Sequence, residues 1–272
     1  MTERIGVCTW SLRPENPADL GEKLLAVGVD SAQLALEPVR SGRWSFEETV
    51  VAVAKTGVEL VSGMMEMAGE DYSTLESIAR TGGVRPDATW ESNLAAAHEN
   101  ARLARRFSLD LVTFHAGFLP HDRDDPERAK LVDRLGQVAD AFAAEGVEVA
   151  FETGQESALT LLGVLEELGR DDVGVNFDPA NMILYGTGDP VEALRLLAPC
   201  VRQVHVKDAR PTEVPGTWGE EVVVGEGAVD WDAFLDVLAA DCPVDRIVER
   251  EAGDRRVEDV VVARRFLEER AR

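Results

Sequence analysis

Residues 147–181 read VEVAFETGQESALTLLGVLEELGRDDVGVNFDPAN. An apolar run over Val147–Glu152 is followed by an amphipathic stretch, and a second apolar run covers Val173–Asp178. Apolar, β-branched runs that alternate with amphipathic stretches are typical of a parallel sheet covered by helices. This part of the chain therefore predicts a strand, a helix and a second strand, and each strand ends on a carboxylate.

The same alternation extends along the whole chain and gives eight predicted strands. They are Ile5–Thr9, Ser31–Leu36, Glu59–Gly63, Leu109–His115, Val147–Glu152, Val173–Asp178, Val201–Val206 and Arg246–Glu249. Eight parallel strands joined by right-handed crossovers can close into a barrel that leaves no exposed edge. Such a barrel takes about 250 residues, and the chain has 272. The predicted fold class is therefore α/β, a single (β/α)8 TIM barrel domain over residues 1–272.

The charge balance argues against nucleic acid as a partner. Lys and Arg number 28 against 51 Asp and Glu, which gives a formal net charge of −23. Such a charge repels a phosphate backbone. No apolar run approaches the roughly 18 residues that a membrane helix needs, so a membrane partner is not expected either.

The three cysteines, Cys8, Cys200 and Cys242, are widely spaced and form no CxxC motif. An odd number at such spacings fits a reducing compartment better than a disulfide framework or a thiolate zinc site. We therefore expect free thiols and a cytoplasmic protein. The sequence is compatible with a homo-oligomer and does not specify the number of copies.

Two connections are longer than a barrel requires, Met64 to about Pro86 and Asp208 to about Gly227. Loops beyond about 12–15 residues usually serve as lids or binding loops. Both connections follow predicted strands, so they belong to the C-terminal rim. Barrel enzymes have their active sites at that rim.

Four consecutive predicted strands end in ionisable residues, Glu152, Asp178, His205 and Glu249. The ends of neighbouring strands lie side by side, so these side chains should converge. Three crowded carboxylates would repel one another at a cost of several kcal/mol, and a divalent cation removes that conflict. Three oxygen ligands and one imidazole favour Mn²⁺, Mg²⁺, Co²⁺ or Fe²⁺, while Zn²⁺ is also possible. We expect one divalent ion, with Mn²⁺ preferred.

Each of these residues also has a simpler interpretation. Asp178 precedes Pro179 and could cap a helix, and His205 alone could be a hydrogen-bonded core histidine. Glu251 competes with Glu249, because residues two apart on a strand face the same side. Glu249 is preferred because it is nearer the apolar strand.

Five motifs carry a family resemblance: TFHAGF at 113–118, FETGQE at 151–156, NFDPAN at 176–181, HVKD at 205–208 and GEGAVDW at 225–231. Together they resemble the xylose isomerase-like TIM barrels grouped as sugar phosphate isomerases and epimerases. The resemblance implies that Glu152, Asp178, His205 and Glu249 bind the metal. Ketose 3-epimerases commonly have His at the position of Asn181 and Arg at the position of Pro211, and this difference argues against a free-ketohexose epimerase.

Six further residues are candidates for substrate binding. His115 ends a predicted strand and is assigned either to substrate hydrogen bonding or to orienting Glu152. Lys207 is a candidate partner for an oxyanion, with Asp208 orienting it, or else it forms a cap or a surface ion pair. Asn181 is included through the resemblance. The other candidates lie on predicted rim loops, as a wall for a sugar ring or as ordinary packing residues: Trp10, Glu66 and Trp218.

These residues favour a metal-dependent isomerase or epimerase that acts on a small sugar or keto-polyol. Glu152 and Glu249 would flank the reacting carbon as base and acid, and the reaction would pass through an enediolate. An inosose-type dehydratase and a catalytically silent sugar-binding barrel are the alternatives. The sequence does not specify the sugar, its phosphorylation or the native metal.

Overall fold

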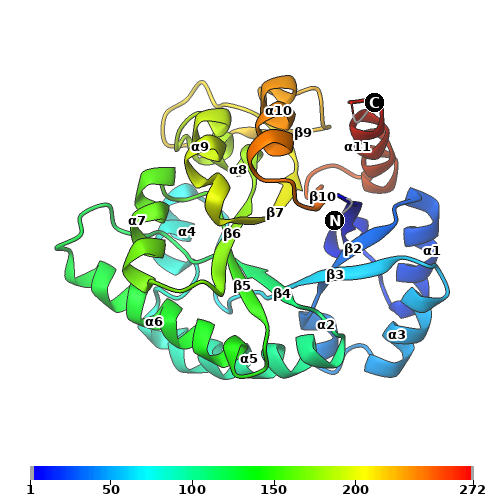
Figure 1. Cartoon of the computed structure of the whole chain (residues 1–272), viewed down its shortest axis with the longest axis horizontal. Helices are drawn as coiled ribbons and strands as arrows, with labels where there is room; N and C mark the ends of the chain where they lie inside the picture. Colours follow the sequence, from blue (N-terminus) through cyan, green and yellow to red (C-terminus); the bar gives the residue numbers. More distant parts are fainter. Residues whose placement is uncertain (1–2, 271–272) are drawn as a thin grey trace.

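A computed structural model describes residues 3–270, so the outermost residues of the predicted domain, 1–2 and 271–272, lie outside the described part. Eight parallel strands form a closed barrel in the order β1-β10-β7-β6-β5-β4-β3-β2 (Figure 1). The strands are β1 Ile5–Cys8, β2 Ser31–Ala35, β3 Glu59–Met64, β4 Leu111–Phe114, β5 Glu148–Glu152, β6 Val173–Phe177, β7 Val201–Val206 and β10 Arg246–Val248. The predicted (β/α)8 barrel is therefore confirmed.

The barrel closes between its first and last strands. Ile5 pairs with Arg246 and Val7 with Val248 in a parallel register. The ends of β5, β6, β7 and β10 lie next to one another, because these strands are consecutive in the barrel order.

Helices surround the strands (Figure 1). They are α1 Pro17–Val27, α2 Glu37–Arg40, α3 Phe46–Ala54, α4 Leu75–Thr81, α5 Asp87–Arg106, α6 Pro126–Ala143, α7 Ala158–Leu168, α8 Pro179–Tyr185, α9 Pro190–Leu197, α10 Trp231–Asp241 and α11 Arg256–Arg270, with short 3-10 helices η1 Thr9–Leu12 and η2 Ala198–Cys200. Asp189 illustrates how they begin, because its side chain accepts the N–H groups of Val191 and Glu192 at 2.9 Å. Within residues 3–270, no helix has the length and apolar character needed to cross a membrane.

The strands are apolar on their outer side and polar on their inner side. Phe177 of β6 packs against Phe234 of α10, with ring centroids 5.7 Å apart. In contrast, Ser62 of β3 donates a hydrogen bond to Gln203 of β7, and these two strands are not neighbours in the barrel. The contact therefore crosses the interior, which holds a layer of buried polar side chains.

The long connection after β7 contains more structure than its sequence predicts. A small antiparallel sheet, β8 Asp208–Arg210 with β9 Glu220–Val222, lies within it. The buried carboxylate of Asp208 accepts hydrogen bonds from the N–H groups of Gly225 and Gly227 and from Trp231 Nε1. A Cβ on Gly227 would lie 2.0 Å from Asp208 Oδ1, so this close approach requires glycine. The expectation that Asp208 orients Lys207 is wrong, because its carboxylate holds this returning segment instead.

Candidate metal centre

The four residues expected to share an ion lie together. Glu152, Asp178, His205 and Glu249 each offer one ligand atom, and these atoms lie within 4.8 Å of one another. The four residues are at most 4% exposed. His205 Nδ1 is 3.5 Å from Glu152 Oε1, 3.9 Å from Asp178 Oδ2 and 3.4 Å from Glu249 Oε2. The closed strand order thus produces the convergence that the sequence pattern indicates.

The donor atoms fit a divalent cation. Asp178 Oδ2 and His205 Nδ1 are buried and have no hydrogen-bond partner. An unsatisfied buried polar group costs about 1–3 kcal/mol, and here two such atoms face the same point. Three carboxylates and one imidazole are ligands that suit Mn²⁺, Mg²⁺, Co²⁺ or Fe²⁺. A bound cation would satisfy both atoms and the crowded carboxylates together.

The two carboxylate oxygens of Asp178 have different roles, one as a helix cap and the other in the cluster of potential ligands. Oδ1 caps α8 by accepting the N–H of Asn181 at 2.9 Å, while Oδ2 faces the other ligand atoms. Burial raises the pKa of Asp178 to about 7, although Lys207 Nζ, 3.6 Å away, opposes this rise. The cap expected from Pro179 and the place in the cluster are therefore compatible.

Neighbouring donors hold the two glutamates in place. Glu152 Oε1 accepts a hydrogen bond from Asn181 Nδ2 at 2.8 Å. Glu249 accepts one from Trp10 Nε1 at 2.8 Å and another from Lys207 Nζ at 2.8 Å. Burial alone would raise the pKa of both glutamates, but the cationic neighbours outweigh it and lower both pKa values. Both side chains therefore favour the ionised carboxylate form.

Lys207 is buried rather than at the surface, with 3% exposure. Besides Glu249, it contacts Glu251 Oε2 at 2.6 Å and Asn181 Oδ1 at 3.2 Å. Burial would lower the pKa of Lys207, but the surrounding carboxylates raise it well above its usual value. Glu251 is half exposed at 52% and lies outside the cluster of four, which places Glu249, and not Glu251, among the potential ligands.

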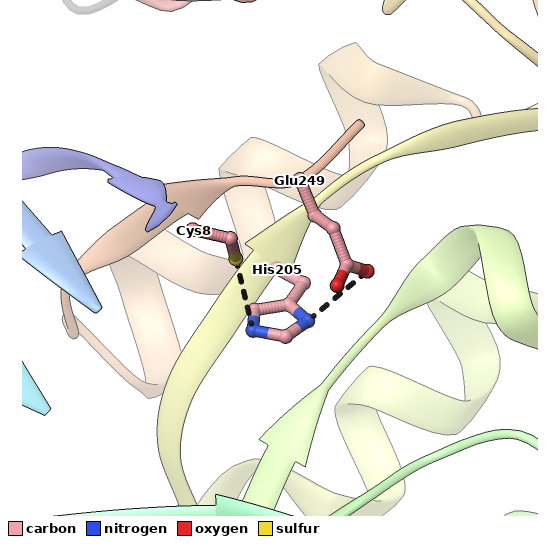
Figure 2. Close-up of side chains that lie close together, drawn as sticks. All are labelled: Cys8, His205 and Glu249. Atoms are coloured by element: carbon pink, nitrogen blue, oxygen red, sulfur yellow. Dashed lines mark hydrogen bonds and ion pairs between the residues drawn. The ribbon is translucent and has the colours of Figure 1, made fainter. Parts of the chain in front are cut away.

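Figure 2 shows a second group of possible ligands, Cys8, His205 and Glu249. The ring lies between the other two side chains, with Cys8 Sγ 3.6 Å from Nε2 and Glu249 Oε2 3.4 Å from Nδ1. One ion bound to Nδ1 therefore cannot also contact the thiol. Burial raises the pKa of Cys8, so the thiol stays protonated. The other two cysteines are also free thiols, as expected.

A cavity of about 1080 Å³ reaches the cluster at Glu249. Its lining includes all six predicted substrate-binding residues: Trp10, Glu66, His115, Asn181, Lys207 and Trp218. His115 Nε2 lies 3.8 Å from Glu152 Oε1. This position is compatible with a hydrogen bond to substrate and with orientation of Glu152, the two roles predicted for His115. Trp10 does more than line the wall, since its indole N–H binds Glu249.

Two aromatic residues of this cavity, Tyr72 and Tyr185, were not among the residues predicted from the sequence. Tyr185 packs against Trp218 with ring centroids 4.9 Å apart, and Tyr72 lies 6.2 Å from His115. They are the two tyrosines of the chain. Both lie in segments that follow a strand at the C-terminal rim, which is the sequence feature that could have identified them.

The comparison with protein families agrees with this geometry. Residues 22–268 match the family described as xylose isomerase-like TIM barrel. A xylose isomerase domain protein from Planctomyces limnophilus shares 32% identity, with a TM-score of 0.84 over 91% of this chain and 90% of that one. The uncharacterised protein YihM of Escherichia coli (strain K12) is 30% identical over 149 residues. That match covers 54% of this chain and 45% of YihM, so the chain spans about half the length of this relative.

More distant solved structures share the fold. The 3-keto-D-glucoside 4-epimerase YcjR from E. coli has 15% identity and a TM-score of 0.74, with 98% of this chain and all of that one covered. A xylose isomerase-like TIM barrel protein from Mycobacterium smegmatis in complex with magnesium has 16% identity and a TM-score of 0.73, with 98% and 95% covered.

Proposed function

The chain belongs to the xylose isomerase-like TIM barrel family, and we propose that it is a divalent-metal-dependent isomerase or epimerase of a sugar or keto-polyol. One observation carries the proposal. Three carboxylates and an imidazole meet within 4.8 Å, at a cavity lined by aromatic and hydrogen-bonding side chains. The fold shared with a 3-keto-D-glucoside epimerase and with a magnesium-bound barrel supports it. We propose Mn²⁺ as the preferred ion.

Glu152, Asp178, His205 and Glu249 would hold the ion. When bound, a divalent cation polarises a substrate carbonyl and stabilises the negative charge of an enediolate. Asp178 Oδ2 and His205 Nδ1 have no hydrogen-bond partner, so we assign these two residues to metal binding alone. The two glutamates, whose oxygens accept hydrogen bonds from neighbouring donors, are assigned to proton transfer as well as to metal binding.

Glu152 and Glu249 approach the cluster from separate strands, β5 and β10. We assign the Glu152 carboxylate as the base that removes the proton from the carbon beside the carbonyl. Glu249 is assigned as the acid on the other side, where it donates a proton that its carboxylate has first taken up from solvent. Their donors, Asn181 for Glu152 and Trp10 for Glu249, fix the carboxylate orientations. Lys207 adds a buried positive charge beside the oxygen that becomes anionic.

The cavity wall suits a sugar ring. Trp10, Tyr185 and Trp218 present aromatic surface, against which the apolar face of a ring can pack. Return of the proton to the neighbouring carbon gives isomerisation, and return to the opposite face of the same carbon gives epimerisation.

Proton exchange tests this function without knowledge of the product. The Mn²⁺-loaded protein is incubated in D₂O with ketoses, keto-inositols and 3-keto-sugars, and each compound is followed by NMR. We expect deuterium at a carbon beside a carbonyl, and we expect chelation to remove this activity and Mn²⁺ to restore it. Full exchange in metal-free protein would contradict the proposal, and loss of a β-hydroxyl would identify a dehydratase instead.

A further inference from the structure

A buried amide lies directly behind the histidine of the cluster. Gln33 is on β2 and His205 on β7, and both are fully buried. His205 Nε2 is 2.7 Å from Gln33 Oε1, on the side of the ring opposite to the carboxylates. β2 and β7 are not neighbouring strands, so this contact crosses the barrel interior.

The surroundings of Gln33 fix which way its amide points. Gln33 Nε2 donates to the carbonyl oxygen of Gly63 at 3.3 Å and to Thr113 Oγ1 at 2.9 Å. A backbone carbonyl only accepts hydrogen bonds, so the amide nitrogen must be on that side. The amide oxygen therefore faces His205, and it also accepts the thiol hydrogen of Cys8 at 3.4 Å.

This orientation determines the proton position on the imidazole. An amide oxygen accepts only, so His205 Nε2 must carry a hydrogen. In the neutral ring Nδ1 then has the free lone pair, and Nδ1 is the atom that faces Glu152 and Glu249. Asn176 Nδ2 carries two hydrogens, donates one to Glu152 Oε2 at 3.4 Å and lies 3.0 Å from His205 Nε2. The contact of Nε2 with Gln33 Oε1 is shorter, at 2.7 Å, and it is the one that assigns the hydrogen to Nε2.

We propose that Gln33 is a positioning residue, which fixes the tautomer and the ring orientation of His205 so that Nδ1 is presented to a divalent metal ion. The inference rests on the metal centre of the proposed function, and it assigns a role to a residue outside the cavity lining. Outer contacts of this kind usually change metal affinity by 10–100-fold when they are removed.

Three variants separate positioning from simple packing. Gln33→Met keeps the volume and removes the acceptor, and we expect it to weaken Mn²⁺ binding by about 10–100-fold in calorimetric titration. Gln33→Glu, protonated at this buried position so that its hydroxyl replaces the donor to the Gly63 carbonyl, keeps an oxygen facing Nε2. We expect its affinity to return to within about threefold of wild type. Gln203→Met is the matched control, because Gln203 is a buried interior amide that bonds to Ser62 and Asn176 and not to His205.

The outcomes distinguish this inference from the proposed function. Wild-type affinity in Gln33→Met, or an equal loss in Gln203→Met, would overturn the positioning role and leave the metal centre intact. Absence of Mn²⁺ binding by the wild-type chain would overturn both. A direct measurement on the wild type needs no variant: ¹⁵N-histidine NMR of the diamagnetic Zn²⁺ form should show a hydrogen on Nε2 of His205, and a hydrogen on Nδ1 would contradict the proposal.

Discussion

The two halves of the barrel are both built from parallel strands, but one half carries ionisable side chains and the other carries neutral ones. β5, β6, β7 and β10 carry the ionisable cluster at their ends, whereas β1, β2 and β3 contribute the neutral side chains Cys8, Gln33 and Ser62 to the interior. His205 contacts both halves, with Nδ1 toward the carboxylates and Nε2 toward Gln33. The closed sheet therefore brings the ionisable groups together on one side, while a neutral side chain from the other side contacts the histidine among them.

Glu152→Gln should produce the largest effect, because it removes the proposed base from the ionisable half. We expect proton exchange to fall by about 10²–10⁴-fold while the circular dichroism spectrum and melting temperature stay close to wild type. Deuterium incorporation followed by NMR measures the loss. Proton exchange at the wild-type rate would show that Glu152 is not the base.

Lys207→Met should reduce turnover by about 10²-fold, the size found for loss of one group that stabilises an oxyanion. Mn²⁺ affinity should not fall, since the variant removes a cation that lies 2.8 Å from Glu249 and 3.6 Å from Asp178. Turnover and calorimetric titration measured on one preparation check both parts. A parallel loss of metal binding and turnover would instead make Lys207 a structural part of the centre.

Asp178→Asn and Glu251→Gln compare two carboxylates that both contact Lys207. Asp178 is fully buried and has an unpartnered Oδ2, so its loss should weaken Mn²⁺ binding by at least about tenfold. Glu251 is half exposed, and its pair with Lys207 is expected to matter little, within about threefold. Equal losses of affinity in the two variants would contradict the assignment of Asp178.

Glu156→Gln should have the smallest effect on turnover and should change stability instead. Burial raises the pKa of Glu156 to about 8, so ionisation in the folded state is unfavourable. The free energy of unfolding should fall as the pH rises from about 4.5 to 8, by up to several kcal/mol. In Glu156→Gln this contribution should disappear, and urea unfolding at pH 5, 6.5 and 8 measures it. The same pH dependence in both proteins would show that Glu156 is not the source.

Much of the barrel follows from local patterns. The eight predicted strands follow from β-branched runs that are bounded by turns and helix caps, such as Asp178 between β6 and α8. The cluster follows from topology, because β5, β6, β7 and β10 are consecutive in the strand order of the barrel.

The inner polar layer did not follow from these patterns. Gln33 and Asn176 are polar residues within largely apolar runs, and the partner of Gln33, His205, is 172 residues away in sequence. The β8–β9 pair was missed because its strands have three residues each within a segment rich in Gly and Pro. Interactions of this kind are determined by three-dimensional packing, which a local sequence pattern does not contain.

Anomalous diffraction from crystals soaked in Mn²⁺ tests the central claim most directly. The account predicts one strong peak per chain, in contact with Glu152, Asp178, Glu249 and the Nδ1 atom of His205, while Nε2 faces Gln33. A map without a peak at this position, or a peak that contacts fewer than three of these residues, would contradict it.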